Sequence, residues 1–228
     1  EWVLNARICD KIADNLKHYS GYELRRADDV TGAKDIPLET RTDNANAWGA
    51  DFYLSVHHDA GLGGKNGGGA TVYVYTGASG KSKQYQSTVY DELIKQTGKF
   101  GNRSIPKAEK NLHVCRETKM PAVLIECGFM DSPSDVPLIL SEDFANKAAK
   151  GLTNALVQIG GLTKKGSVES VAKFTDTKGH YAEKVIDELA EMGVVNGKGN
   201  GQFAPNDTIT RAEAAMMIRN AIRYITGK

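Results

Sequence analysis

Residues 51–57 read DFYLSVH and residues 121–128 read PAVLIECG, and these two stretches decide the fold. Apolar residues alternate along the first stretch, which is typical of a strand that carries His57 at its C-terminal edge. The second stretch is a short apolar run, typical of a buried strand, and it delivers Glu126 in the same way. Because open α/β sheets build their sites at the carboxyl ends of strands, we expect both side chains at one edge of a sheet. A histidine there can bind a metal, and a glutamate can act as base for the metal-bound water.

Helix and strand patterns alternate around these two stretches. The alternation predicts a βαβ-type α/β domain with three layers. Ser141 is expected to cap the last helix, because acidic residues follow it in the first turn. Residues 61–69 contain six glycines and are expected to form a flexible loop beside the site. The expected helices cover residues 2–18, 38–48, 81–98 and 141–156, and two further strands are expected at residues 22–26 and 71–75.

The composition limits the possible partners. Hydrophobic residues make up 40% of the 228-residue chain, enough for a packed core, and charged residues make up 25%. The formal net charge of +1 gives no electrostatic case for nucleic acid or an acidic membrane as partner. No apolar run is long enough for a membrane span. The chain starts Glu-Trp-Val, without an initiator methionine or a signal-peptide pattern, so we expect that a leader was removed or that the chain is a fragment.

The chain has three cysteines, at positions 9, 115 and 127. An odd number without CxxC spacing argues against a disulfide framework and against a cysteine zinc site. Each lies in an apolar context, so we expect all three to be buried or half-buried free thiols.

After residue 161 the sequence changes character. Residues 162–171 are small and polar and are expected to form a linker. Two short amphipathic helices are expected beyond it, separated by a glycine-rich turn at residues 196–201. Thr210 and Glu213 have the spacing of a capping box at the start of the second helix. A helix pair with so little core is marginal alone, so we expect it to lean on another repeat, another chain or the first domain.

Several polar residues lie at or near the two strand ends. A carboxylate such as Glu126, closing an apolar strand, is costly to bury unless it is paired or bound to a metal. His58 follows His57 directly and therefore points to the opposite side of an extended chain, where we expect a supporting or structural role. Asp59 and His113 are further candidates for contact with the site.

Residues 44–57 and 120–129 resemble the zinc-dependent N-acetylmuramoyl-L-alanine amidases of the type-3 family, and the resemblance covers residues 1–161. It implies a three-layer α/β/α domain with a mixed, mainly parallel sheet. It also implies the activity, which is hydrolysis of the amide bond between N-acetylmuramic acid and L-alanine of peptidoglycan by a zinc-activated water.

The same resemblance implies roles for three residues. His57 matches a zinc ligand of the family, and Glu126 matches its catalytic glutamate. Glu1 matches a second zinc ligand, because residues 1–5 read EWVLN where the family has a Glu-x-x-Leu-Asn pattern. The family's first histidine, in an Asp-Pro-Gly-His-Gly-Gly motif that closes the first strand, has no counterpart here. By its place in the family it belongs upstream of Glu1.

Two other functions stay open from the sequence. Because that histidine has no counterpart, the chain could be a catalytically dead or truncated cell-wall-binding protein. A carbohydrate deacetylase, or another zinc hydrolase on a different fold, would require both motifs to be coincidental. The zinc content of the chain discriminates the amidase from the dead protein.

Residues 172–228 resemble one surface-layer-homology repeat, a small all-helical domain, and the Thr-Arg-Ala-Glu sequence at residues 210–213 is its most specific part. The resemblance implies binding to secondary polysaccharides of Gram-positive cell walls. Arg211 is the expected glycan-binding residue, since an anionic glycan favours a fixed guanidinium. The alternative is a capping or salt-bridge role beside Glu213. Together the resemblances imply a secreted, cell-wall-associated amidase of a Gram-positive bacterium or its phage.

Overall fold

The chain divides into two compact units. The computed structural model describes residues 1–98, 104–165 and 174–226. The first unit is Glu1–Lys165 and the second is Gly166–Lys228. Of the linker expected at residues 162–171, residues 166–171 lie outside the described part. Thr163–Lys164 form strand β6 of the first unit, which pairs antiparallel with β1 (Tyr19–Ser20).

A four-stranded mixed sheet forms the centre of the first unit. Strand β5 pairs in parallel with β2 on one side and antiparallel with β3 on the other, and β3 pairs in parallel with β4. Two of the three pairings are parallel, so the prediction of a mixed, mainly parallel sheet is confirmed. Across the sheet the strands are β2 (Tyr53–Asp59), β5 (Ala122–Phe129), β3 (Thr71–Val74) and β4 (Lys107–Glu109).

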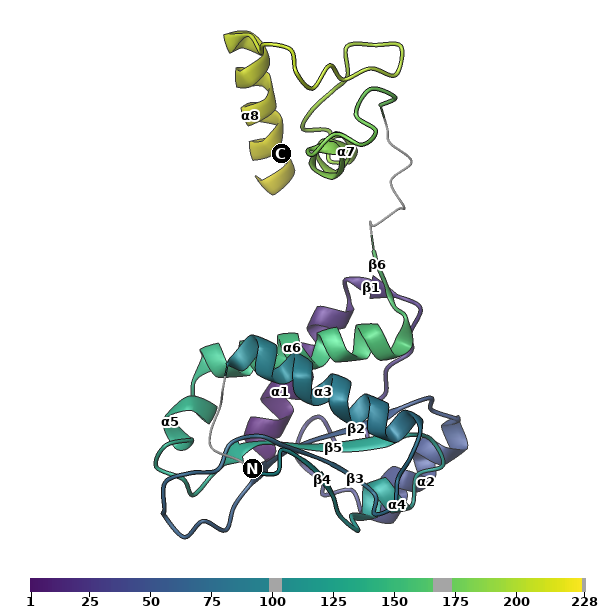
Figure 1. Ribbon diagram of the computed structural model, residues 1–228, viewed down its shortest axis with the longest axis vertical. Helices are drawn as coiled ribbons and strands as arrows, with labels where there is room; N and C mark the ends of the chain where they lie inside the picture. Colours follow the sequence, from purple (N-terminus) through teal and green to yellow (C-terminus); the bar gives the residue numbers. More distant parts are fainter. Residues whose placement is uncertain (99–103, 166–173, 227–228) are drawn as a thin grey trace. The chain divides into compact units, whose positions relative to one another are not determined.

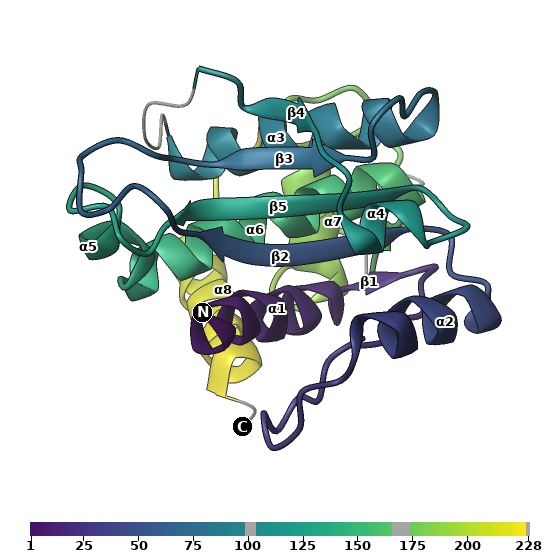
Figure 2. The ribbon, with the colours of Figure 1, turned by 90° about the horizontal axis from the view of Figure 1, so that it is seen from below.

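Helices cover both faces of this sheet, which makes the first unit three-layered, as predicted (Figures 1 and 2). Three long helices pack on one face and two shorter ones on the other. A further short helix, α5 (Val136–Ile139), follows β5. The first face carries α1 (Trp2–Leu16), α3 (Lys81–Thr97) and α6 (Glu142–Gly160), and the second carries α2 (Leu38–Trp48) and α4 (His113–Arg116).

Alternate residues of β5 face two separate hydrophobic cores. Val123, Ile125 and Cys127 are fully buried in the larger core, together with residues of α1, α3 and α6. Ala122 and Leu124 belong to the smaller core, which includes residues of α4. Since side chains alternate along a strand, Glu126 points to the same face as Leu124, the face with the smaller core.

Helix α6 covers much of the larger core. Ser141 caps it as predicted, because its Oγ accepts a hydrogen bond from the Phe144 N–H at 3.1 Å. At Gly151 the helix comes very close to α3. A Cβ atom at this position would lie 2.6 Å from the Glu92 carbonyl oxygen and 2.9 Å from the Leu93 Cα. The absence of a side chain at residue 151 therefore permits this packing distance.

The expectation of a strand at residues 22–26 is wrong. This segment is extended but is assigned to no strand, and β1 lies just before it, at Tyr19–Ser20. A strand requires a neighbouring strand for its backbone hydrogen bonds, and the segment instead lines a cavity beside β2. Local sequence pattern carries no information about that missing partner.

The three cysteines are free, as predicted. Cys115 and Cys127 are buried and Cys9 is half-buried. Burial raises the pKa of Cys9 to about 11, and burial likewise raises the pKa of Cys115 to about 11. Both side chains are therefore uncharged thiols at neutral pH.

The second unit is built from two helices around a small core. Helix α7 (Glu183–Glu191) contributes Ile186 and Ala190 to that core, and α8 (Arg211–Thr226) packs Met217 and Ala221 against it. The remaining core residues come from the flanking loops, namely Phe174, Val194 and Val195. In the described part of both units, no helix combines the length and apolar character that crossing a membrane requires.

The predicted capping box at the start of α8 is confirmed. The Thr210 N–H donates to Glu213 Oε2 at 2.7 Å, and the Glu213 N–H donates to Thr210 Oγ1 at 3.1 Å. Thr210 Oγ1 also contacts Glu213 Oε2 at 2.7 Å. These bonds satisfy backbone donors that the first helical turn leaves without partners.

Gly151→Ala should destabilise the first unit. Alanine favours a helix over glycine by about 1 kcal/mol, but the added methyl group must push α6 away from the backbone of α3, at an expected cost of about 1–3 kcal/mol. Urea unfolding followed by circular dichroism measures the difference. Gly160→Ala is the matched control, because near the end of α6 the added Cβ would meet only the Leu162 side chain, which can rotate. Equal stability of the two variants would contradict the close contact at Gly151.

Candidate functional site

His57 and Glu126 lie side by side in the sheet. The register of the parallel β2–β5 pair places His57 opposite Glu126, and the β3–β5 pair places Thr71 on the other side of Glu126. Adjacent strands are about 4.8 Å apart, and neighbours in register point to the same face of a sheet. By alternation from Leu124, that face is the one with the smaller core. The sequence predicted that His57 and Glu126 lie close together in one sheet, and this register agrees with that prediction.

Both residues lie inside their strands, which corrects the expectation that they close them. Strand β2 continues to Asp59 and β5 continues to Phe129. The Met130 N–H still donates to the Asp59 carbonyl at 2.8 Å, so backbone pairing extends past the two side chains. The register shifts between His57 and Asp59, which marks a bulge or irregularity at this point of the β2–β5 pair.

Glu1 completes a polar cluster at His57. Helix α1 lies beside β2, at the edge of the sheet (Figure 2). Residue Glu1 precedes the helix, and its Oε1 is 2.7 Å from His57 Nδ1. The other ring nitrogen, Nε2, is 2.9 Å from Ser55 Oγ. Both partners of the first contact remain reachable from solvent, with 33% of the His57 side chain and 42% of the Glu1 side chain exposed.

The surroundings of Glu1 favour its ionised form. Partial burial would raise the pKa of the Glu1 carboxyl, but hydrogen bonds with His57 and Asn5 and the charge interaction with His57 outweigh it and hold the pKa below its usual value. An ionised carboxylate beside an imidazole can accept a hydrogen bond from a ring N–H, or it can bind a cation.

These donors fit zinc by type but supply only part of a site. Zinc in proteins takes histidine nitrogen and carboxylate oxygen, usually from three residues at a catalytic site. Glu1 and His57 are already in contact with each other. Within residues 1–98, 104–165 and 174–226, no three His, Cys, Asp or Glu side chains group closely enough to hold a metal ion. The described residues therefore bring together two candidate metal-binding side chains, Glu1 and His57.

His58 points to the opposite face, as predicted. It is 2% exposed, and its Nδ1 lies 2.8 Å from Asn5 Oδ1 on α1. Burial lowers the pKa of His58 to about 4, although the charge of Glu1 opposes this effect. Asn5 Nδ2 in turn donates to Glu1 Oε1 at 3.2 Å. The role of Asn5 was not found from the sequence, although its position four residues after Glu1 on a helix is the spacing that brings side chains together.

The two further candidates have other contacts. His113 Nε2 lies 3.3 Å from Thr42 Oγ1, between α4 and α2. Asp59 Oδ1 accepts a hydrogen bond from the Ala60 N–H at 2.9 Å. Neither contact connects the residue to Glu1 or His57.

The glycine-rich loop at residues 61–69 is anchored at both ends by carboxylates. Asp131 Oδ2 accepts hydrogen bonds from the Gly61 and Gly63 N–H groups at 2.9 and 2.8 Å. Asp135 Oδ2 accepts from the Gly69 N–H at 2.8 Å. These two anchors were not recognised in the sequence, because the partners are 66 or more residues apart.

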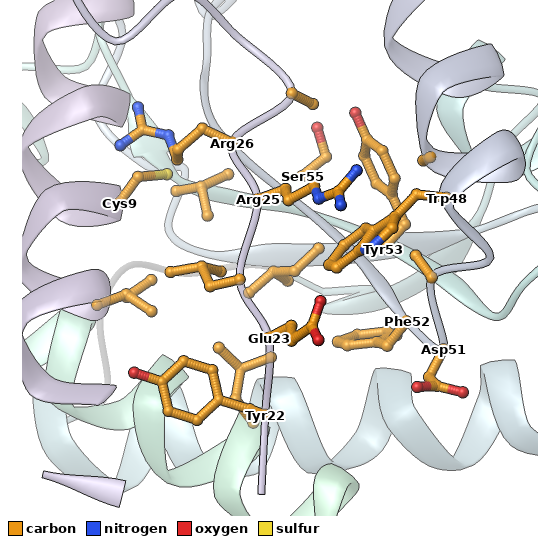
Figure 3. Close-up of a pocket in the computed structure, with 18 of the residues that line it drawn as sticks. Cys9, Tyr22, Glu23, Arg25, Arg26, Trp48, Asp51, Phe52, Tyr53 and Ser55 are labelled. Carbon is orange, nitrogen blue, oxygen red and sulfur yellow. The ribbon is translucent and has the colours of Figure 1, made fainter. Parts of the chain in front are cut away.

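A cavity of about 1540 Å³ lies beside the outer edge of β2. Its walls come from α1, the segment at residues 21–28, α2, β2 and parts of α3 and α6, and its lining includes His57. Figure 3 shows aromatic and charged side chains on these walls, and the Arg25 guanidinium lies 4.4 Å from the ring centre of Trp48. Arg26 makes two hydrogen bonds of 2.8 Å to Asp28. Asn5, Ser55 and His57 also line this cavity.

Arg211 belongs to the second unit and is exposed at the first position of α8. The Glu213 carboxylate, its alternative partner, contacts Thr210 through Oε2.

Comparison with protein families gives one match for each unit. Residues 1–158 match the family described as N-acetylmuramoyl-L-alanine amidase. Residues 173–215 match the S-layer homology domain.

Individual relatives agree with the first match. A sporulation-specific N-acetylmuramoyl-L-alanine amidase of Bacillus subtilis strain 168 is 35% identical over 165 residues, which cover 65% of this chain and 62% of the relative. An endolysin of Bacillus phage SPP1 is 37% identical over 148 residues, covering 64% of this chain and 54% of the relative. The chain thus spans less than two thirds of the length of these curated relatives.

A solved structure shares the fold. The N-acetylmuramoyl-L-alanine amidase from Clostridium difficile 630 superposes with a TM-score of 0.62 at 29% identity, covering 69% of this chain and 82% of that one. Because the family match spans residues 1–158, more than half of the sequence, the chain belongs to the N-acetylmuramoyl-L-alanine amidase family.

Proposed function

We propose that the chain hydrolyses the amide bond between N-acetylmuramic acid and L-alanine in peptidoglycan. The observation that carries this proposal is the register that sets Glu126 beside His57, with Glu1 in contact with the same histidine, in a member of this amidase family. We assign catalysis to residues 1–161, a linker to residues 162–171 and wall binding to residues 172–228.

In this proposal Glu1 and His57 hold a zinc ion together with one further ligand. Both donor types suit zinc, and both side chains are partly exposed. When bound, zinc polarises the scissile carbonyl and lowers the pKa of water. The 2.7 Å contact between Glu1 and His57 keeps the two donors on one side of the sheet edge.

Glu126 acts as the proton carrier. Its carboxylate takes a proton from the attacking water and passes it to the leaving L-alanine nitrogen, first as general base and then as general acid. Its place in β5, between β2 and β3, fixes the backbone from which the side chain extends. A rigid strand positions a catalytic group more accurately than a loop does.

The second unit directs the enzyme to the cell wall. The S-layer homology match supports binding to a secondary cell-wall polysaccharide, with the exposed Arg211 guanidinium contacting its anionic groups. We therefore place the protein outside the cell, secreted and associated with the wall of a Gram-positive bacterium, or encoded by its phage.

One observation favours a second function. Because the described residues bring only two ligands together, the chain alone could be a wall-binding protein without catalytic activity.

Glu126→Gln should lower the rate of amide cleavage by about 100-fold or more, since general acid–base catalysis contributes factors of about 10²–10⁴. The assay is release of new amino groups from purified cell wall. Glu109→Gln is the matched control, because Glu109 lies on β4 of the same sheet and contacts Lys83 away from the cluster. A Glu126→Gln enzyme that cleaves at the wild-type rate contradicts the assignment.

Zinc content separates the enzyme from the inactive wall-binding protein. After equilibration with zinc and removal of the free ion, the amidase proposal expects about one zinc per chain by elemental analysis, and loss of wall cleavage when a chelator removes it. Substitution of His57 by alanine should lower the bound zinc. A chain that binds walls but retains no zinc supports the alternative.

Arg211→Ala should weaken binding to walls that carry an anionic polysaccharide. Loss of a hydrogen bond to a charged group costs about 1.5–3 kcal/mol, which corresponds to about tenfold or more in affinity. Sedimentation with purified walls measures the bound fraction. Arg219→Ala, on the same helix, is the control because Arg219 contacts the neighbouring Asn220. Equal loss in both variants would indicate general charge attraction rather than a site at Arg211.

A further inference from the structure

We propose that half-buried Asn5 and buried His58 form a hydrogen-bonded pair that positions the carboxylate of Glu1. This inference rests on the proposed function, in which Glu1 is a zinc ligand. It adds two positioning residues to the site, one on α1 and one on the face of β2 opposite His57.

The orientation of the Asn5 amide is fixed by its partners. Glu1 Oε1 is a carboxylate oxygen and can only accept, so the atom of Asn5 at 3.2 Å from it must be the Nδ2 donor. The Asn5 carbonyl oxygen then points to His58 Nδ1, 2.8 Å away. A flipped amide would set its oxygen against the carboxylate and its NH₂ group against the imidazole.

The same contacts fix the tautomer of His58. Since Asn5 Oδ1 accepts, His58 Nδ1 must carry the hydrogen. The other nitrogen, Nε2, is buried and has no hydrogen-bond partner within the part of the chain that the structure describes. Its unprotonated form is the one that leaves no buried N–H without an acceptor.

The pair is held by rigid elements. His58 is 2% exposed on β2, and α1 buries Ile8 and Ile12 in the larger core, at 1% and 5% exposure. Asn5 therefore extends from a packed helix, and its hydrogen bond to His58 ties that helix to the strand that carries His57. The Glu1 side chain is more exposed, at 42%, and its side-chain partners are Asn5 and His57.

The consequence concerns the geometry of the two proposed ligands. Glu1 Oε1 receives Asn5 Nδ2 on one side and lies 2.7 Å from His57 Nδ1 on the other. Without Asn5, the carboxylate keeps a single side-chain partner and samples other rotamers. Outer partners of metal ligands typically change metal affinity by about 10–100-fold when removed.

The test compares Asn5→Ala with Asn15→Ala in the full 228-residue chain. Asn15 lies on the same helix and donates to Thr153 Oγ1 at 3.3 Å, far from the cluster in sequence, so it controls for loss of a helix hydrogen bond. Two readouts are used. The first is ¹⁵N NMR of the histidine rings in the metal-free protein, and the second is the zinc Kd from competition with a chromophoric chelator.

In the metal-free protein, the wild type should show His58 with its hydrogen on Nδ1. Asn5→Ala should move His58 toward the Nε2–H tautomer and shift the His57 ring nitrogens, and Asn15→Ala should change neither. If Asn5→Ala leaves both rings unchanged, the proposal is overturned, whatever the zinc affinity. If the wild type binds no zinc but the ring signals respond as expected, the metal role fails and the positioning pair stands.

In the zinc measurement, Asn5→Ala should raise Kd by about tenfold or more, and Asn15→Ala should stay within about twofold of the wild type. His58→Asn keeps an N–H donor near the place of Nδ1 and should retain most of the affinity, whereas His58→Leu should not. Asn5→Asp, which keeps the shape of the side chain, serves if Asn5→Ala fails to fold, and it should weaken zinc binding too. Equal zinc affinity in folded Asn5→Asp and wild type would contradict the role of the pair in zinc binding, and unchanged ring signals in Asn5→Asp would refute the pair itself.

Discussion

The parallel pairing of β2 with β5 is the constraint on which the rest of the structure depends. Side chains alternate with a period of two, so a slip of one residue would move His57 to the opposite face from Glu126. Two cores oppose such a slip, because Val56 and Ile125 are buried on one face and Tyr53 and Leu124 on the other. The packing of apolar residues thus determines that the two polar side chains lie on one face, opposite each other in register.

Helix α1 connects this register to the first residue of the chain. It packs against β2 on the side of the larger core and presents Glu1 at the edge of the sheet. The consecutive residues His57 and His58 then serve the two faces of one strand. One contacts the carboxylate directly, and the other reaches the same carboxylate through Asn5. A single strand therefore supports the cluster from both sides.

Local signals in the sequence predicted local structure well. The Ser141 cap and the Thr210–Glu213 capping box depend on residues three positions apart, and both are present. The relation between His57 and Glu126 was also predictable, because alternation identifies the face and apolar runs identify the strands.

Features that depend on distant partners were not predictable in the same way. The segment at residues 22–26 has a strand-like composition, but no strand in the described part of the chain pairs with it, so its pattern was misleading. The lengths of β2 and β5 past the site depend on their mutual pairing, which placed His57 and Glu126 inside the strands. The anchoring of the glycine-rich loop by Asp131 joins residues 68 and 70 positions apart, and no local pattern signals it.

The outer edge of β2 has a consequence for how the protein behaves at high concentration. Of the described strands only β5 pairs with β2, and an open strand edge is a surface on which a second chain can add a strand. The segment at residues 21–28 carries Arg25 and Arg26 along the cavity beside this edge, and charged side chains discourage such association. With a net charge of +1 the whole molecule adds little repulsion of its own, and salt screens the local charges within about 10 Å at 0.1 M. Higher ionic strength therefore weakens the repulsion that local charges provide along this edge.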